Sequence, residues 1–343
     1  MGMRNTCTAS LLLLGFFVLA IPAEDLAAAQ KGYGIYFDQD LFLPLVNEDR
    51  DYTMGVAVER FERESIFQLL QGPLGSVGSL LSIDEQRGEL RTSYLLGSVN
   101  FTPDDLAATT PVVGDRPYAS VLYLSNKRVV SDAIHAVGVE LQVGLLGAYV
   151  AREIQRHLHR YWREANHSRE PVTPRGWGNQ ISAGGEPTLR LRLAHSGRLL
   201  GDSRHWDLAG TYDLSIGYQT NTSVGLALRT GLLRSDFSSL PYDPINRGNF
   251  VPAFGDDELY LWGAARVRLV GYDALLQGQF RDSPLTYDGD AIRRVVVDAG
   301  AGVTGSWRGV QLTLSANLKT SELDRGPADR TQWWGGFYVT VRR

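Results

Sequence analysis

Apolar and polar residues alternate along most of this chain of 343 residues, a pattern typical of β-strands with one face in an apolar environment. The connections between these segments are very short turns and long polar loops in alternation, as in a meandering membrane barrel. The pattern therefore predicts an all-β fold, a transmembrane up-and-down antiparallel β-barrel. Its thirteen candidate strands are 33–42, 53–61, 93–101, 118–129, 134–147, 179–195, 206–219, 222–233, 257–270, 272–281, 293–306, 309–319 and 331–342.

The number of strands follows from parity, because bacterial single-chain barrels have an even number. The loops can be assigned to the two sides of the membrane by counting strands forward from a periplasmic N-terminus or backward from the C-terminus. The two assignments agree only if 206–233 crosses the membrane once, as one long or bent strand. We therefore predict about twelve strands. Both counts then put the polar loops on one external rim: 42–52, 102–116, 148–177, 234–256, 282–292 and 320–330.

The stretch 150–163 (VAREIQRHLHRYWR) carries the one convincing helical pattern, a narrow apolar stripe at i, i+4 and i+7. Gln155 and His159 are four residues apart, so their side chains project side by side from an adjacent face. His157 is rotated by about 200° from His159 and faces elsewhere. We expect a short helix in an external loop.

The first 29 residues have the features of a secretory signal peptide. A positively charged start is followed by the apolar run 11–21 and by a small-residue cleavage site at 27–29. We therefore expect residues 1–29 to be removed and 30–343 to form the barrel domain. Cys7 is the only cysteine and lies within the signal peptide, so the mature chain has no disulfide and no cysteine metal site.

Composition narrows the possible classes further. The net charge is −4 without a basic tract, which argues against a nucleic-acid partner. Abundant glycine (37) and tyrosine (15) suit a membrane barrel, although a soluble secreted β-barrel that binds a ligand has a similar composition. The tracts 145–150 and 224–233 are richer in apolar residues than outward faces of a soluble barrel would be.

Several polar stretches are too stereotyped for loop filler, and together they resemble one family. In chain order and over nearly all of the mature chain, they are similar to motifs of the lipid A 3′-O-deacylase (LpxR-type) outer-membrane family. The matching stretches are DQD at 38–40, DRDYTMG at 49–55, TPDD at 102–105, DRPYAS at 115–120, Gln155 with His159, GWGNQ at 176–180 and FRDS at 280–283.

The resemblance implies an outer-membrane enzyme, a Ca²⁺-dependent hydrolase that removes the 3′-linked acyl chains of lipid A within lipopolysaccharide. It assigns the base to His159, which is suited to take a proton from water near neutral pH, with Gln155 and Thr53 beside it. The metal ligands would be Asp40, a hard oxygen donor, and Gln39, which stands where the family has Asn. No Gly-x-Ser-x-Gly elbow occurs, which favours attack by water. We expect a monomer.

Each residue also has an ordinary structural explanation. On spacing alone Asp40 is a solvated carboxylate at a strand end, and Thr53 is a residue with β-propensity. Gln39 and Asp40 reach the same site only if the strand ends or bulges there, since adjacent strand residues point to opposite faces. A non-enzymatic outer-membrane barrel, a pore or structural protein that has lost the activity through the change at Gln39, is the main alternative.

Overall fold

A computed structural model describes residues 31–43, 50–62, 71–80, 88–165, 173–202, 204–239 and 257–342. The predicted signal peptide, 1–29, lies outside these residues. Within the described ranges, no helix has the length and apolar character to cross a membrane.

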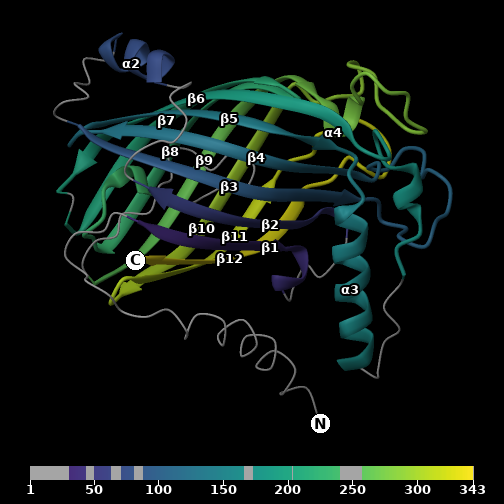
Figure 1. Ribbon diagram of the computed structural model, residues 1–343, viewed down its shortest axis with the longest axis horizontal. Helices are drawn as coiled ribbons and strands as arrows, with labels where there is room; N and C mark the ends of the chain where they lie inside the picture. Colours follow the sequence, from purple (N-terminus) through teal and green to yellow (C-terminus); the bar gives the residue numbers. More distant parts are fainter. Residues whose placement is uncertain are drawn as a thin grey trace.

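Twelve antiparallel strands form one closed barrel, in which each strand pairs with its neighbours in sequence and β1 pairs with β12 (Figure 1). Closure is continuous, with Gly32 opposite Arg342 at one end of the β1–β12 seam and Gln39 opposite Gly335 at the other. This confirms the predicted barrel. The strands are β1 (Gly32–Gln39), β2 (Asp51–Glu62), β3 (Glu89–Thr102), β4 (Ala119–Ser131), β5 (His135–Leu146), β6 (Glu186–Gly201), β7 (Trp206–Gly217), β8 (Gln219–Leu232), β9 (Glu258–Asp273), β10 (Val295–Trp307), β11 (Val310–Lys319) and β12 (Gln332–Arg342).

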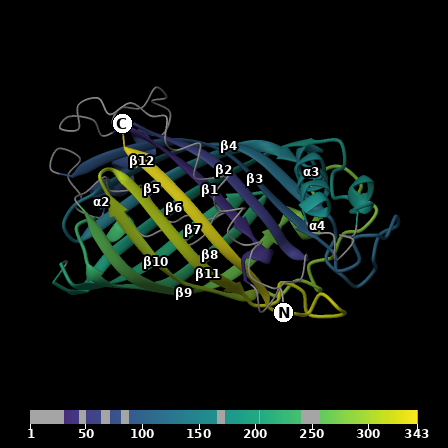
Figure 2. The same cartoon turned by 90° about the horizontal axis from the view of Figure 1, so that it is seen from below.

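Short helices lie at both ends of the barrel. Helix α2 (Gln71–Leu80) and the C-terminus lie at one end, and α3 (Val150–Ala165) and α4 (Ala274–Gln277) at the opposite end (Figures 1 and 2). Helix α3 leaves that end steeply to the strand direction (Figure 1). Three 3₁₀ turns complete the described structure: η1 (Asp40–Phe42), η3 (Gly176–Asn179) and η4 (Phe237–Ser239).

The alternation in the sequence corresponds to two different faces of the barrel wall. Outward positions carry exposed apolar side chains such as Val58, Leu96, Leu124, Leu226 and Leu261, as a lipid-facing surface does. Inward positions carry buried ions, which survive burial because they are paired: Arg229 with Asp207, Arg266 with Asp298, Arg192 with Asp213 and Lys127 with Glu59.

Two details of the strand prediction are wrong, although the count of twelve is right. The stretch 206–233 is two strands, β7 and β8, because the chain reverses within Gly217–Tyr218. The candidate 272–281 is not a strand: β9 continues to Asp273 through a bulge at Gly271, and α4 follows.

This correction moves one predicted loop. The connection between β8 and β9 leaves from the end opposite to α3, so 234–256 does not share the rim with the other polar loops. Residues 240–256 themselves lie outside the described structure.

Candidate functional site

The polar motifs converge on the end of the barrel that carries α3. The DQD stretch lies at the end of β1 and in η1, TPDD begins at the last residue of β3, and DRPYAS leads into β4. GWGNQ forms η3 and the residue after it. Loops that are far apart in sequence thus share one rim, as the loop pattern predicted for these motifs.

Near this rim the outward face of β1 and β3 is polar and buried instead of apolar and exposed. Gln39 follows Tyr33, Ile35 and Phe37 on the outward face of β1, yet it is only 4% exposed. On β3, Asn100 and Thr102 continue the outward row of Leu96 and are 1% and 0% exposed. We call Gln39, Thr53, Asn100 and Thr102 the outer polar cluster.

Gln39 and Asp40 meet because strand β1 ends between them. Gln39 is the last strand residue, and Asp40 starts η1. The amide nitrogen Nε2 of Gln39 donates to Oδ1 of Asp40 at 3.1 Å, and the backbone N–H of Arg50 donates to Oδ2 at 3.0 Å. The strand end that the sequence required for a shared site is therefore present.

The amide oxygen of Gln39 is buried and has no hydrogen-bond partner among the described residues. A buried acceptor without a partner costs about 1–3 kcal/mol, so such an atom needs an explanation. Beside it lies the Asp40 carboxylate. Carboxylate and amide oxygens are the donors that Ca²⁺ takes, so these two residues fit a calcium ion in chemistry. The described residues hold no group of three His, Cys, Asp or Glu side chains placed for a metal.

Thr53 lies at a β-bulge, where the pairing of β2 with β3 skips from Tyr52 to Met54. The bulge re-aims the side chain, and its hydroxyl lies 2.5 Å from the hydroxyl of Thr102. Asn100 closes the cluster by donating to the backbone carbonyl of Met54 at 3.3 Å. Thr53 is thus held by a specific partner, which β-propensity alone does not explain.

Gln155 is buried on the face of α3 that packs against η3. The indole N–H of Trp177 donates to its amide oxygen Oε1 at 2.7 Å, which fixes the amide orientation and turns the NH₂ group away from the indole. Trp177 packs on Tyr118 with ring centroids 4.8 Å apart. With Leu106 and Ala151, these aromatic rings form a small apolar core under the helix.

His159 lies one turn after Gln155 in α3, but its side chain is outside the part of the chain that the structure describes. The continuous helix keeps residues four apart on one face, as predicted. His157 is exposed on another face. Helix α3 contacts β3, the strand that carries Asn100 and Thr102.

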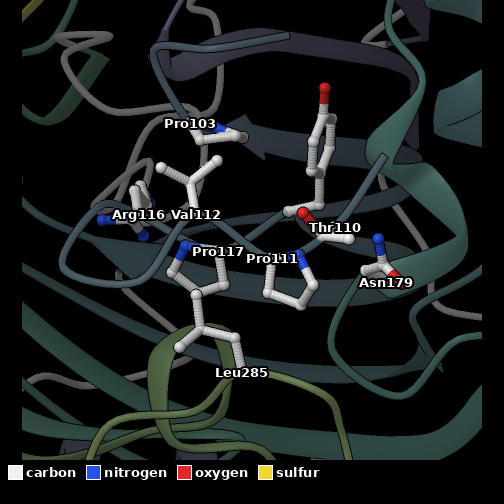
Figure 3. Close-up of a pocket in the computed structure, with 9 residues that line it drawn as sticks. Pro103, Thr110, Pro111, Val112, Arg116, Pro117, Asn179 and Leu285 are labelled. Carbon is white, nitrogen blue, oxygen red and sulfur yellow. The ribbon is translucent and has the colours of Figure 1, made fainter. Parts of the chain in front are cut away.

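The loop between β3 and β4 supports this region as a rigid scaffold. Figure 3 shows Pro103, Pro111 and Pro117 gathered with Val112 around one small cavity. The cavity measures about 10 Å³, which holds one water at most. Because proline fixes φ, the loop is stiff, and this cavity is not a substrate site.

Buried ion pairs tie the rim together. Arg330 bonds both carboxylate oxygens of Asp51, at 2.7 and 2.9 Å, and also contacts Asp115 at 2.7 Å. Arg116 pairs with Glu322. Burial alone would raise the pKa of the Glu322 carboxyl, but attraction to Arg116 and Lys319 outweighs it and holds this pKa well below its usual range.

Sequence reasoning missed four residues of this region: Thr102, Trp177, Asn100 and Arg330. The first two lie inside the TPDD and GWGNQ motifs, so their positions were marked without a role. Arg330 lies outside every motif, and only the fold shows that it joins two acidic segments.

Comparisons with known proteins agree with this architecture. Residues 11–343 match the family described as "Outer membrane protein LpxR". The structure is similar to LpxR from Salmonella typhimurium, with a TM-score of 0.70 and 16% identity over 90% of this chain and 99% of that one. The β domain of the Bordetella autotransporter BrkA (TM-score 0.43, 12% identity, 92% and 100% covered) and an outer membrane channel from Pseudomonas putida (0.44, 10%, 94% and 100%) also match. No curated protein matches the chain in sequence.

Proposed function

Because the chain belongs to the LpxR family of outer-membrane proteins, we propose that it is an outer-membrane lipid A deacylase that hydrolyses the 3′-linked acyl esters. Its substrate is lipid A within lipopolysaccharide. The observation that carries this proposal is the outer polar cluster, which lies on the lipid-facing wall of the barrel and not in its lumen. In this proposal a membrane lipid brings its reacting ester to the cluster from that side.

His159 is the general base in this proposal. Its imidazole takes a proton from the water that attacks the ester carbonyl, a role that suits a side chain titrating near neutral pH. The same group then returns the proton to the leaving alkoxide. His157, on another face of α3, is exposed and takes no part.

Gln155 and Thr53 position the reacting groups. Since Trp177 holds the amide oxygen of Gln155, the amide NH₂ is the end that can donate to the attacking water or to the carbonyl oxygen. The Thr53 hydroxyl is oriented by Thr102. Fixed donors of this kind stabilise developing negative charge without reorganisation during the reaction.

Asp40 and Gln39 are the residues that would hold Ca²⁺. The carboxylate supplies charge, and the amide oxygen of Gln39 supplies a buried acceptor that otherwise has no partner. When bound there, the ion would supply Lewis-acid polarisation of the ester carbonyl. The glutamine side chain is one methylene longer than asparagine, and the helical turn that starts at Asp40 leaves it in contact with the carboxylate.

The rival function, a pore, is less consistent with the rim. Arg116, Glu322, Lys319 and Gln332 form one buried, bonded group at the mouth of the barrel. Conductance across a planar bilayer that contains the protein tests the pore function directly.

A deacylation assay with the purified barrel tests the proposal. The protein in detergent is mixed with lipid A, and released fatty acid is quantified with Ca²⁺ or with a chelator. Release in Ca²⁺ that is lost in chelator and in His159→Ala, but kept in the matched variant His157→Ala, supports both the reaction and its base. No release under any condition refutes the deacylase. Equal release of fatty acid by both variants would support the deacylase activity and would show that His159 is not its general base.

A further inference from the structure

At the end of the barrel that carries α3 the wall has a notch, because β7 stops short of its neighbour β6. The last pair between β6 and β7 is Arg190 with Gly217, so Glu186–Leu189 of β6 have no partner in β7. The chain turns at once, because Gly217 has a φ of +137° and a Cβ there would lie 2.1 Å from the carbonyl oxygen of Leu189.

The segment Gly278–Ser283 crosses this notch from β9 to β6 and forms its roof. The backbone N–H groups of Phe280 and Arg281 both donate to Oε1 of Glu186, at 2.7 and 3.0 Å. Gln279 accepts from the Thr188 hydroxyl at 2.7 Å and donates to the carbonyl of Pro187 at 3.2 Å. The roof is therefore fixed to the barrel by its own polar groups.

One side chain of this fixed roof is nevertheless left in the open. The phenyl ring of Phe280 is 86% exposed, although the backbone on both sides of it is bonded. Large aromatic rings at the ends of a membrane barrel lie at the level of the lipid headgroups. The Arg281 guanidinium lies next to it, donates to the carbonyl of Ala183 and is exposed.

Below the roof, an apolar groove of about 540 Å³ opens on the outward face. Val143 and Leu189, both 57% exposed, form its floor, with Tyr218, Tyr272 and Phe280 around it. Val143 and Leu189 belong to the outward rows that make up the lipid-facing wall. The groove is therefore continuous with that wall and is hollowed into it.

We propose that this groove, which we call the roof groove, binds one hydrocarbon chain of an anionic membrane lipid that is distinct from the substrate. Its lining is apolar, its volume is that of a small-molecule site, and its open side faces the membrane. Arg281 follows the groove-lining Phe280 in the roof and is exposed, and its guanidinium is the group that would bind an anionic headgroup. The outer polar cluster lies on β1, β2 and β3, and β4 separates it from the groove, whose floor lies on β5 and β6.

Photo-crosslinking in a bilayer tests this site. The protein is placed in phosphatidylethanolamine nanodiscs that contain a trace of phosphatidylglycerol with a photoactivatable acyl chain, and labelled peptides are mapped by mass spectrometry. We expect labelling of the peptides with Leu189 and Phe280 to exceed that of the exposed lipid-facing Leu226 on β8. Leu189→Trp fills the groove and should lower labelling about tenfold.

The matched control is Leu191→Trp, the same change two residues along the same outward row, which should leave labelling unchanged. Phe280→Ser changes only an exposed side chain, so it folds in any case, and should also lower labelling. Labelling of the groove no stronger than at Leu226, or unaffected by both groove variants, overturns the proposal. So does cross-linking between two copies of the chain in place of lipid. A phosphatidylcholine probe that labels equally well would remove the role of Arg281.

Discussion

The indole of Trp177 holds Gln155, and Trp177→Phe removes that hold while keeping an aromatic ring. The variant leaves the buried amide oxygen of Gln155 without its donor at 2.7 Å, which costs about 1–3 kcal/mol. The smaller ring adds a cavity term of about 1 kcal/mol against Tyr118. Without this donor the amide of Gln155 is less firmly oriented, and loss of such a supporting contact typically lowers activity by about 10- to 100-fold.

Fatty-acid release from lipid A measures the rate, and urea unfolding measures the stability. The matched control is Tyr118→Phe, which removes a hydrogen bond to the carbonyl of Leu106 in the same apolar core and leaves Gln155 alone. We expect both variants to lose stability but only Trp177→Phe to lose kcat. Equal kcat in the two variants, at equal fractions folded, would refute the role of Trp177 as the residue that orients Gln155.

Three further results are expected. Gln39→Asn should keep Ca²⁺-dependent release whereas the near-isosteric Gln39→Leu should abolish it, and equal activity of the two would remove Gln39 from the metal site. Arg330→Met leaves two buried carboxylates without their cation and should lower the free energy of unfolding by about 3–5 kcal/mol, against no measurable change for Arg325→Met at an exposed pair. Because the pKa of Glu322 is lowered in the folded protein, its ion pairs contribute their full stability above the ordinary pKa of about 4.3, and this stability is lost as pH falls through the lower folded value. Glu322→Gln should therefore reduce the loss of unfolding free energy at acid pH, measured by urea titrations at stepped pH. An unchanged dependence of the unfolding free energy on pH would contradict this.

The number of strands was predictable from the sequence, but the strand assignment was not. An even number of strands required that one of the thirteen candidate strands be wrong. Two places in the chain show the same pattern of a short break between alternating segments, and the sequence does not say which of them is a turn. At Gly217–Tyr218 the alternation runs on through a reversal, because a glycine with positive φ turns the chain without a polar loop. At Gly271 a bulge resembles a turn within a continuous strand. Only the pairing of the strands separates these cases.

The candidate site was predictable as a set of residues but not as a geometry. Motifs located Gln39, Asp40, Thr53 and Gln155 on one rim, and the structure places all four there as buried side chains. The sequence gives no sign that outward residues at this height are covered, because burial depends on what α3 and η1 lie against. The unpaired oxygen of Gln39 is likewise visible only in three dimensions.

The most direct measurement of the central claim is mass spectrometry of lipid A from outer membranes of cells that express this chain, beside cells that express His159→Ala at equal level. The account predicts lipid A that lacks its 3′-linked acyl chains in the first cells and full-length lipid A in the second. Lipid A of unchanged mass in both, with the barrel folded in the membrane, would contradict it.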